Sequence, residues 1–235
     1  MATERFIQRH SLQTRITHDV FVIACIWLMI SGLFVFIPPL AAAVPEVARF
    51  MRVTHRIVGC IFIITPIISA IASPGGVKRF FAKYFTKWTP EDWEFLKKFV
   101  PYMLMPKKTH MPDQDEVKSG QRFADGMLML CAVAMAISGV ILWLGISVFH
   151  VSAGVLAVQR FIHDLFFLIL VIFTIAHIFL GAGIFEPYRP GHMIGLMFGN
   201  GQIDESDALY HWGFWARKEI EEGKNIVVKE VPDKK

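Results

Sequence analysis

Four long apolar stretches separated by polar segments dominate the pattern of this chain. They lie at about 20–37, 57–72, 127–146 and 161–185. A helix of about 20 apolar residues crosses a hydrocarbon core of about 30 Å, so the pattern predicts membrane-spanning helices. The second stretch is short and contains Pro66, and we expect its helix to extend back through His55 and to bend at the proline. The predicted fold is an all-α membrane four-helix bundle with spans at about 17–37, 54–73, 122–146 and 160–185.

Composition and charge agree with this fold and orient it. Apolar residues make up 54% of the chain and the mean hydropathy is +0.47, whereas about 45–50% apolar is usual for a soluble domain. Of the 24 Lys and Arg residues, 20 lie in the N-terminal arm, in the segment 74–122 and after Phe185. Because positive charge collects on the cytoplasmic side, we expect both termini and the long 74–121 loop to face the cytoplasm. The net charge of +4 is then a topology signal, and no nucleic-acid partner is expected.

Outside the spans, the chain divides into the long loop and a tail. We expect a membrane domain at 1–200 and a cytoplasmic C-terminal tail at 201–235. Within the loop, Thr89 and Pro90 match the cap and the first residue of a short helix. Its apolar stripe, which includes Trp93 and Leu96, would lie either on the membrane surface or against the bundle.

Two histidines inside the fourth apolar stretch indicate a function. His163 and His177 are 14 residues apart, which is two heptads, so both project from nearly the same helix face. At the helical rise they lie roughly 21 Å apart along the axis. A histidine inside a membrane span is costly and usually functional. Two on one face, at two depths, indicate a helix that ligates two haems. The chain has no C-x-x-C-H motif, so the haems would be held non-covalently.

Depth in the membrane selects the partners of these histidines. The predicted topology places His55 near the outer end of the second span and His18 near the cytoplasmic end of the first. A bis-histidine haem needs two imidazoles at similar depth, which pairs His55 with His163 at an outer haem and His18 with His177 at an inner haem. The histidines of the loops and the tail, His211 among them, are expected to be solvated. Arginines near the candidate ligands are candidate propionate partners: Arg15, Arg52, Arg56 and Arg160.

A short internal repeat occurs in the first and third spans. Ile30-Ser31-Gly32-Leu33 matches Ile137-Ser138-Gly139-Val140. Fourteen residues before the two glycines stand His18 and Asp125, so only the first copy carries a candidate ligand. The sequence leaves open whether the repeat is functional, coincidental or a small-residue packing motif.

Several short segments carry a wider similarity. They are Arg15-Ile16-Thr17-His18, the segment 52–59, Ser119-Gly120-Gln121-Arg122, the segment 138–143, and the helix that contains His163 and His177. Over about residues 10–200 the chain resembles the cytochrome b (gamma) subunit of respiratory formate dehydrogenases. That subunit belongs to a wider group with the cytochromes b of nickel–iron hydrogenases and thiosulfate reductases.

The resemblance implies cofactors, partners and a location. Two haem b groups would lie in a multi-pass protein of the bacterial cytoplasmic membrane. An iron–sulfur subunit would deliver electrons at the outer face, and menaquinone or ubiquinone would be reduced near the cytoplasm. The family's quinone contacts map onto His177, Gly120 and Gln121, and Lys118 stands where the family has an asparagine. The chain would thus be the quinone-reducing subunit of a multi-subunit oxidoreductase, with the dehydrogenase active site on a separate catalytic subunit.

Other interpretations stay open at this point. The electron donor could instead be a hydrogenase, a thiosulfate reductase or another oxidoreductase. A haem-free transporter would use intramembrane histidines for metal or protons, but few other ionisable residues lie deep in the predicted spans. A membrane anchor without electron transfer would need none of the four histidines.

Overall fold

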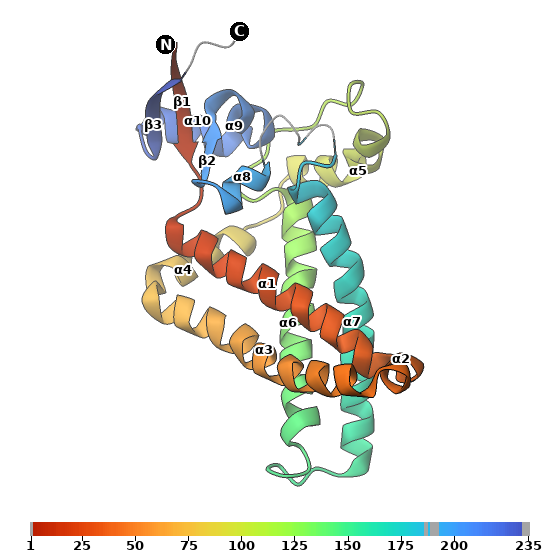
Figure 1. The fold of residues 1–235 in the computed structure, drawn as a ribbon. Coiled ribbons are helices and arrows are strands. Elements are labelled where there is room, and N and C mark those ends of the chain that lie inside the picture. The colour runs from red at the N-terminus through yellow and green to blue at the C-terminus, as the bar shows by residue number, and fades with distance from the viewer. Residues whose placement is uncertain (1, 186–187, 189–192, 232–235) are drawn as a thin grey trace. The chain divides into compact units, whose positions relative to one another are not determined.

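Four long apolar helices are the main elements of the structure. This computed structural model describes residues 2–185, 188 and 193–231. The helices long and apolar enough to cross a membrane are α1 (Leu12–Phe36), α3 (Pro45–Ala72), α6 (Ser119–Leu144) and α7 (Ala153–Gly181) (Figure 1). The prediction of four apolar helices is confirmed. The helices begin earlier than the apolar stretches, because polar residues extend each helix into the interface. In α3, Pro45 occupies the first helical position, which suits proline.

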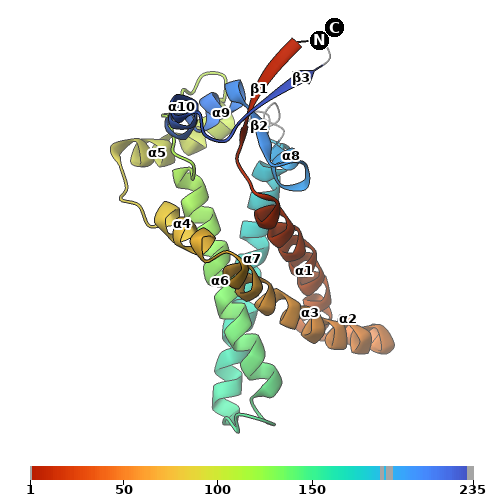
Figure 2. The same ribbon diagram turned by 90° about the vertical axis from the view of Figure 1, so that its left-hand side faces the viewer.

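The chain divides into two compact units. The span unit contains Ile16–Ser73 and Met127–Ala176, and the terminal unit contains Met1–Arg15, Pro74–Gly126 and His177–Lys235. In the span unit α1 and α3 run in opposite directions and are joined through the short α2 (Pro38–Ala43), while α6 and α7 lie side by side (Figures 1 and 2). One end of α6 and one end of α7 belong to the terminal unit.

The helices of the span unit expose apolar side chains and bury small ones. Ile23, Ile71 and Ile172 are 71%, 74% and 66% exposed, whereas Ser31 and Ser138 are completely buried. Exposed isoleucines suit contact with acyl chains, and small buried residues let helices approach one another closely. This distribution is that of a protein whose solvent is lipid.

The terminal unit contains a three-stranded sheet of order β2-β1-β3 (Figure 2). β1 (Ala2–Gln8) pairs antiparallel with β2 (Gln202–Asp204) on one side and with β3 (Ile226–Val231) on the other. Ile7 stands opposite Ile203 and Ile226 in these two ladders and is completely buried. The all-α prediction is therefore wrong for these segments, because the strands pair across most of the chain length and no local pattern reports such pairing.

Three short helices pack with this sheet: α8 (Met193–Phe198), α9 (Glu205–His211) and α10 (Gly213–Glu222). Their shared core contains Ile7, Leu196, Ile203, Ala208, Trp212, Trp215 and Ala216. Residues 202–231, which lie in the segment that we expected as a separate tail, fold together with the N-terminal strand.

The segment between the second and third spans forms α4 (Pro74–Tyr84) and α5 (Pro90–Leu104). α5 begins where the sequence predicts, since Thr89 and Asp92 form a reciprocal capping box. Its buried face contains Phe95 and Tyr102, whereas Trp93 from the predicted apolar stripe is 54% exposed. The apolar residues of α5 thus divide between two faces, and only one of them packs within the terminal unit.

Candidate functional site

His55 of α3 and His163 of α7 face each other in the span unit. Their ring centroids are 6.5 Å apart, with 67° between the ring planes. Two metal–imidazole bonds of roughly 2 Å, together with the radii of two five-membered rings, would span roughly 6 Å. The structure thus brings this predicted pair together, at a ring spacing that would admit one metal ion between the two imidazoles.

Each of these imidazoles contacts a buried serine hydroxyl. Ser31 Oγ lies 2.8 Å from Nδ1 of His55, and Ser138 Oγ lies 2.8 Å from Nδ1 of His163. Both hydroxyls also donate to the carbonyl four residues earlier in their own helix, at 2.7 Å for Ser31 and 2.6 Å for Ser138. A hydroxyl has one proton to donate, so each serine accepts a hydrogen bond from Nδ1–H of its histidine. That bond fixes the tautomer in which Nε2 carries the lone pair that can bind a metal.

The glycine after each serine makes room for the same imidazole. A Cβ atom at Gly32 would lie 3.5 Å from Cε1 of His55, and one at Gly139 would lie 3.3 Å from Cε1 of His163. The Ser-Gly repeat therefore forms two equivalent contact sites for a histidine, one on α1 and one on α6; each is called a histidine seat and consists of the serine hydroxyl and the space above the glycine. The repeat is visible in the sequence but its role is not, because each Ser-Gly pair contacts a histidine of the following long helix and not of its own helix.

These residues fit a haem. A porphyrin iron takes only two protein ligands, because the macrocycle supplies the other four. Within the described part of the chain, no group of three or more His, Cys, Asp or Glu side chains is placed to hold a bare metal ion. Two facing imidazoles with fixed tautomers form a donor set that suits a bis-histidine haem iron.

The four candidate propionate partners differ in their surroundings. Arg52, Arg56 and Arg160 are exposed and lie within one helical turn of His55 or His163 in sequence. The guanidinium of Arg56 lies 5.9 Å from the Trp143 ring. Arg15 instead belongs to the terminal unit, where it donates to the carbonyl of Gly199.

The second predicted pair, His18 and His177, is divided between the two units, so its pairing stays a prediction. Nδ1 of His177 lies 3.7 Å from Oδ1 of Asp125 on α6. The other oxygen of Asp125 accepts hydrogen bonds from the Tyr84 hydroxyl at 2.6 Å and from Gln121 Nε2 at 3.1 Å. Asp125 is thus the partner of a candidate ligand, which sequence analysis did not recognise. A carboxylate beside a ligand imidazole orients the ring and raises its basicity.

The three candidate quinone residues lie at the start of α6 in different surroundings. Gln121 bonds to Asp125, as described above. A Cβ atom at Gly120 would lie 3.0 Å from the Phe95 ring. Lys118 is buried and turns to the C-terminal segment, where its Nζ lies 3.3 Å from Nδ1 of His211.

Aromatic rings surround the Lys118 amine. Its Nζ lies 4.4 Å from the Tyr188 ring centre and 4.5 Å from that of Trp212. Burial lowers the pKa of Lys118 well below its ordinary value, and repulsion from Arg9 adds to the shift. His211, which we expected to be solvated, is only 6% exposed and stacks on Tyr188. This prediction is wrong because α9 folds the tail back over the start of α6.

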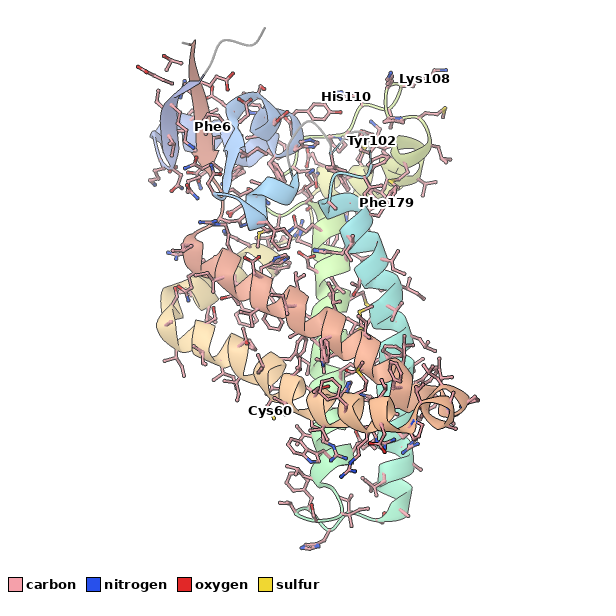
Figure 3. The ribbon with its side chains drawn as sticks, viewed as in Figure 1. Phe6, Cys60, Tyr102, Lys108, His110 and Phe179 are labelled. Carbon is pink, nitrogen blue, oxygen red and sulfur yellow. The ribbon has the colours of Figure 1, made fainter. Side chains whose placement is uncertain are left out.

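A pocket of about 180 Å³ reaches Lys118 and His211. Tyr102 and His110, both labelled in Figure 3, also line it. The remaining lining residues come from α5, the segment before α6 and the C-terminal segment: Phe95, Thr109, Met111, Pro112, Asp113, Gln114, Tyr188, Leu209 and Tyr210.

Four apolar helices and a pair of oriented histidines define a class of protein, the helical membrane cytochromes of the b type. The family model described as prokaryotic cytochrome b561 matches residues 9–199, and the chain belongs to this family. A search of curated proteins found no match. The chain is accordingly a multi-pass membrane protein of a family that transfers electrons with haem b.

Proposed function

We propose that this chain is the di-haem cytochrome b subunit of a formate dehydrogenase-type complex in the bacterial cytoplasmic membrane. It carries electrons from an iron–sulfur partner at the outer face to a quinone near the cytoplasmic face. The supporting observation is the pair of imidazoles of His55 and His163, each fixed by a buried serine. Burying such polar groups costs free energy, and an anchor without haem would gain nothing in return.

The haem groups supply one-electron redox chemistry when they are bound. The chain holds and orients them. His55 and His163 ligate the outer group, and His18 and His177 ligate the inner one. α7 carries both His163 and His177, and the helical rise over 14 residues corresponds to roughly 21 Å.

The cytoplasmic end of the span helices handles the quinone. Gly120, Gln121 and Lys118 stand at the start of α6, and Gln121 shares Asp125 with His177. Protons for the quinol come from the cytoplasm, whereas the electrons enter from the outer face. Charge therefore crosses the membrane during turnover.

Formate dehydrogenase as the partner rests on the resemblance of the segment 119–122. A hydrogenase, thiosulfate reductase or other oxidoreductase would use the same electron path. The haem-free transporter and the anchor remain the candidates of a different class.

The first test is a reduced-minus-oxidised absorption spectrum of the purified full chain, with haem extracted and quantified. We expect two haem b groups per chain. His55→Ala and His177→Ala should each lose one group, while His150→Asn, in the loop between α6 and α7, should keep both. A folded protein without haem would overturn the proposed function. Haem reduction by formate in the native membrane would then identify the electron donor.

A further inference from the structure

The Lys118 amine is buried between the rings of Tyr188 and Trp212. Asp113 lines the same pocket but pairs with Arg217, and Glu116 pairs with Lys83. Among the described residues, no ion pair of Lys118 with a carboxylate is found. A buried ammonium that lacks such a partner gives up a proton readily.

His211 is placed to exchange a proton with this amine. Its Nδ1 lies 3.3 Å from Lys118 Nζ, and its ring is fixed by stacking on Tyr188, with centroids 5.1 Å apart and planes at 19°. Imidazole both accepts and donates protons near neutral pH. An amine and an imidazole in contact can pass a proton from one to the other, so Lys118 and His211 can form a proton relay.

The pocket connects this pair to the surface. Lys118, His211 and Tyr102 are 7%, 6% and 3% exposed, whereas Tyr210 is 65% exposed. Flat aromatic side chains line the space between them. At about 180 Å³ the pocket is smaller than the roughly 300–1,000 Å³ sites of drug-sized ligands, which limits it to a compact ring system.

We propose that this pocket takes the headgroup of the quinone, that Lys118 donates a proton to a quinone oxygen, and that His211 reprotonates Lys118. This role rests on the proposed function, which assigns Lys118 to the quinone site, and adds to it the origin of a proton. Phe95 lines the pocket and contacts Gly120, so the pocket adjoins the family's quinone segment.

The proton transfers balance as follows. A quinone takes two electrons and two protons to become the quinol, and the electrons come from the donor of the proposed function. For one proton, the Nζ–H bond of Lys118 breaks as the quinone O–H bond forms. The neutral amine then takes the Nδ1 proton of protonated His211, and the neutral imidazole takes a new proton from water in the pocket.

Several titratable groups around the pair affect its pH dependence. Arg9 repels the charge on Lys118, and Asp113 and His110 line the pocket. Burial raises the pKa of Tyr188 to about 12 and that of Tyr102 well above its usual range, so both keep their hydroxyl protons at neutral pH. The Tyr210 hydroxyl lies 3.5 Å from that of Tyr102.

The test uses the full chain in detergent with haem bound. Duroquinol is mixed with the oxidised protein, and haem reduction is followed by stopped flow at several pH values. In this direction Lys118 accepts the proton and His211 removes it. We expect Lys118→Met to slow the reaction by roughly 100-fold, in the range of general acid–base catalysis, and His211→Ala by roughly tenfold or more. Imidazole added to the buffer should restore part of the His211→Ala rate.

Controls separate the possible failures. His211→Asn keeps the volume near Nδ1 but cannot titrate, so it should be slow while its haem spectrum and content stay unchanged. His150→Asn should react like the wild type, and its backbone at φ 49° suits asparagine. If the wild type reacts and both His211 variants keep its rate and pH profile, the relay is refuted and the proposed function stands. If the wild-type haem does not react with quinol at all, both are refuted.

Discussion

Removing the hydroxyl of Ser31 should change the redox potential of the haem that we propose His55 to ligate. Ser31 Oγ accepts a hydrogen bond from Nδ1–H of His55 at 2.8 Å, and the serine is completely buried. In Ser31→Ala the Nδ1–H group loses this acceptor. The imidazole becomes a weaker base and stabilises ferric iron less, so the potential should rise.

The magnitude follows from the strength of one hydrogen bond. A net contribution of about 0.5–1.5 kcal/mol, present mainly in the ferric state, corresponds to roughly 20–60 mV, since a factor of ten equals 59 mV for one electron. Loss of a hydrogen-bond partner of a ligand also lowers metal-site affinity by roughly 10–100-fold. We therefore expect a rise of a few tens of millivolts together with weaker haem retention.

The assay is a potentiometric titration of the haem absorption, with the electron paramagnetic resonance spectrum of the ferric form as a second readout. Thr65→Ala is the matched control, because Thr65 lies on α3, the helix that carries His55, and its Oγ1 donates to the Ile61 carbonyl at 2.7 Å. Ser138→Ala should act like Ser31→Ala, since its hydroxyl contacts His163 in the same way. Potentials of both serine variants that stay within a few millivolts of the Thr65→Ala value would refute the tautomer assignment.

Three further predictions concern haem fit and stability. Gly139→Ala should lower the haem content measured by extraction, because its Cβ would press on the His163 ring at 3.3 Å, whereas Gly154→Ala, with its nearest contact at 3.8 Å, should not. Lys118→Met should stabilise the fold near pH 7 by roughly 1–3 kcal/mol and so raise the thermal unfolding temperature, because burial disfavours the charged form of the amine. Asp92→Asn should destabilise the fold by roughly 3–5 kcal/mol and so lower the thermal unfolding temperature, because it leaves the buried guanidinium of Arg122 without its ion-pair partner.

The contributions of Lys118 and Asp92 to stability should both depend on pH, because folding lowers the pKa of a base in one case and of an acid in the other. The folded pKa of Lys118 lies below its unfolded value, so the unfolded state binds more protons between the two. Wild-type stability should therefore rise with pH from the lowered folded pKa towards 10.5, and Lys118→Met should lack this rise.

Burial raises the pKa of Asp92, but hydrogen bonds from Arg122, Thr89 and Ser119 outweigh it and bring the net pKa below 3.8. Its contribution should be present above pH 3.8 and disappear as the pH falls through the folded pKa. Unfolding curves of Lys118→Met and Asp92→Asn that parallel the wild type across these ranges would contradict both assignments.

The sequence by itself determined the membrane character and the candidate ligands. Long apolar stretches report spanning helices directly, because lipid selects side chains by their polarity alone. His163 and His177 are 14 residues apart, and helix geometry places residues at this spacing on nearly the same helix face. The start of α5 was also predictable, since Thr89, Pro90 and Asp92 form a local capping signal.

Only the tertiary structure decided which side chains meet. Ser31 and Ser138 each seat a histidine of another helix, and sequence spacing holds no information about contacts between helices. Likewise, β1 pairs with strands near the other end of the chain, and that pairing brings the tail to Lys118 and buries His211. Local patterns predicted the four long helices and the start of α5, whereas packing between distant segments created the sheet, the serine–histidine contacts and the lysine pocket.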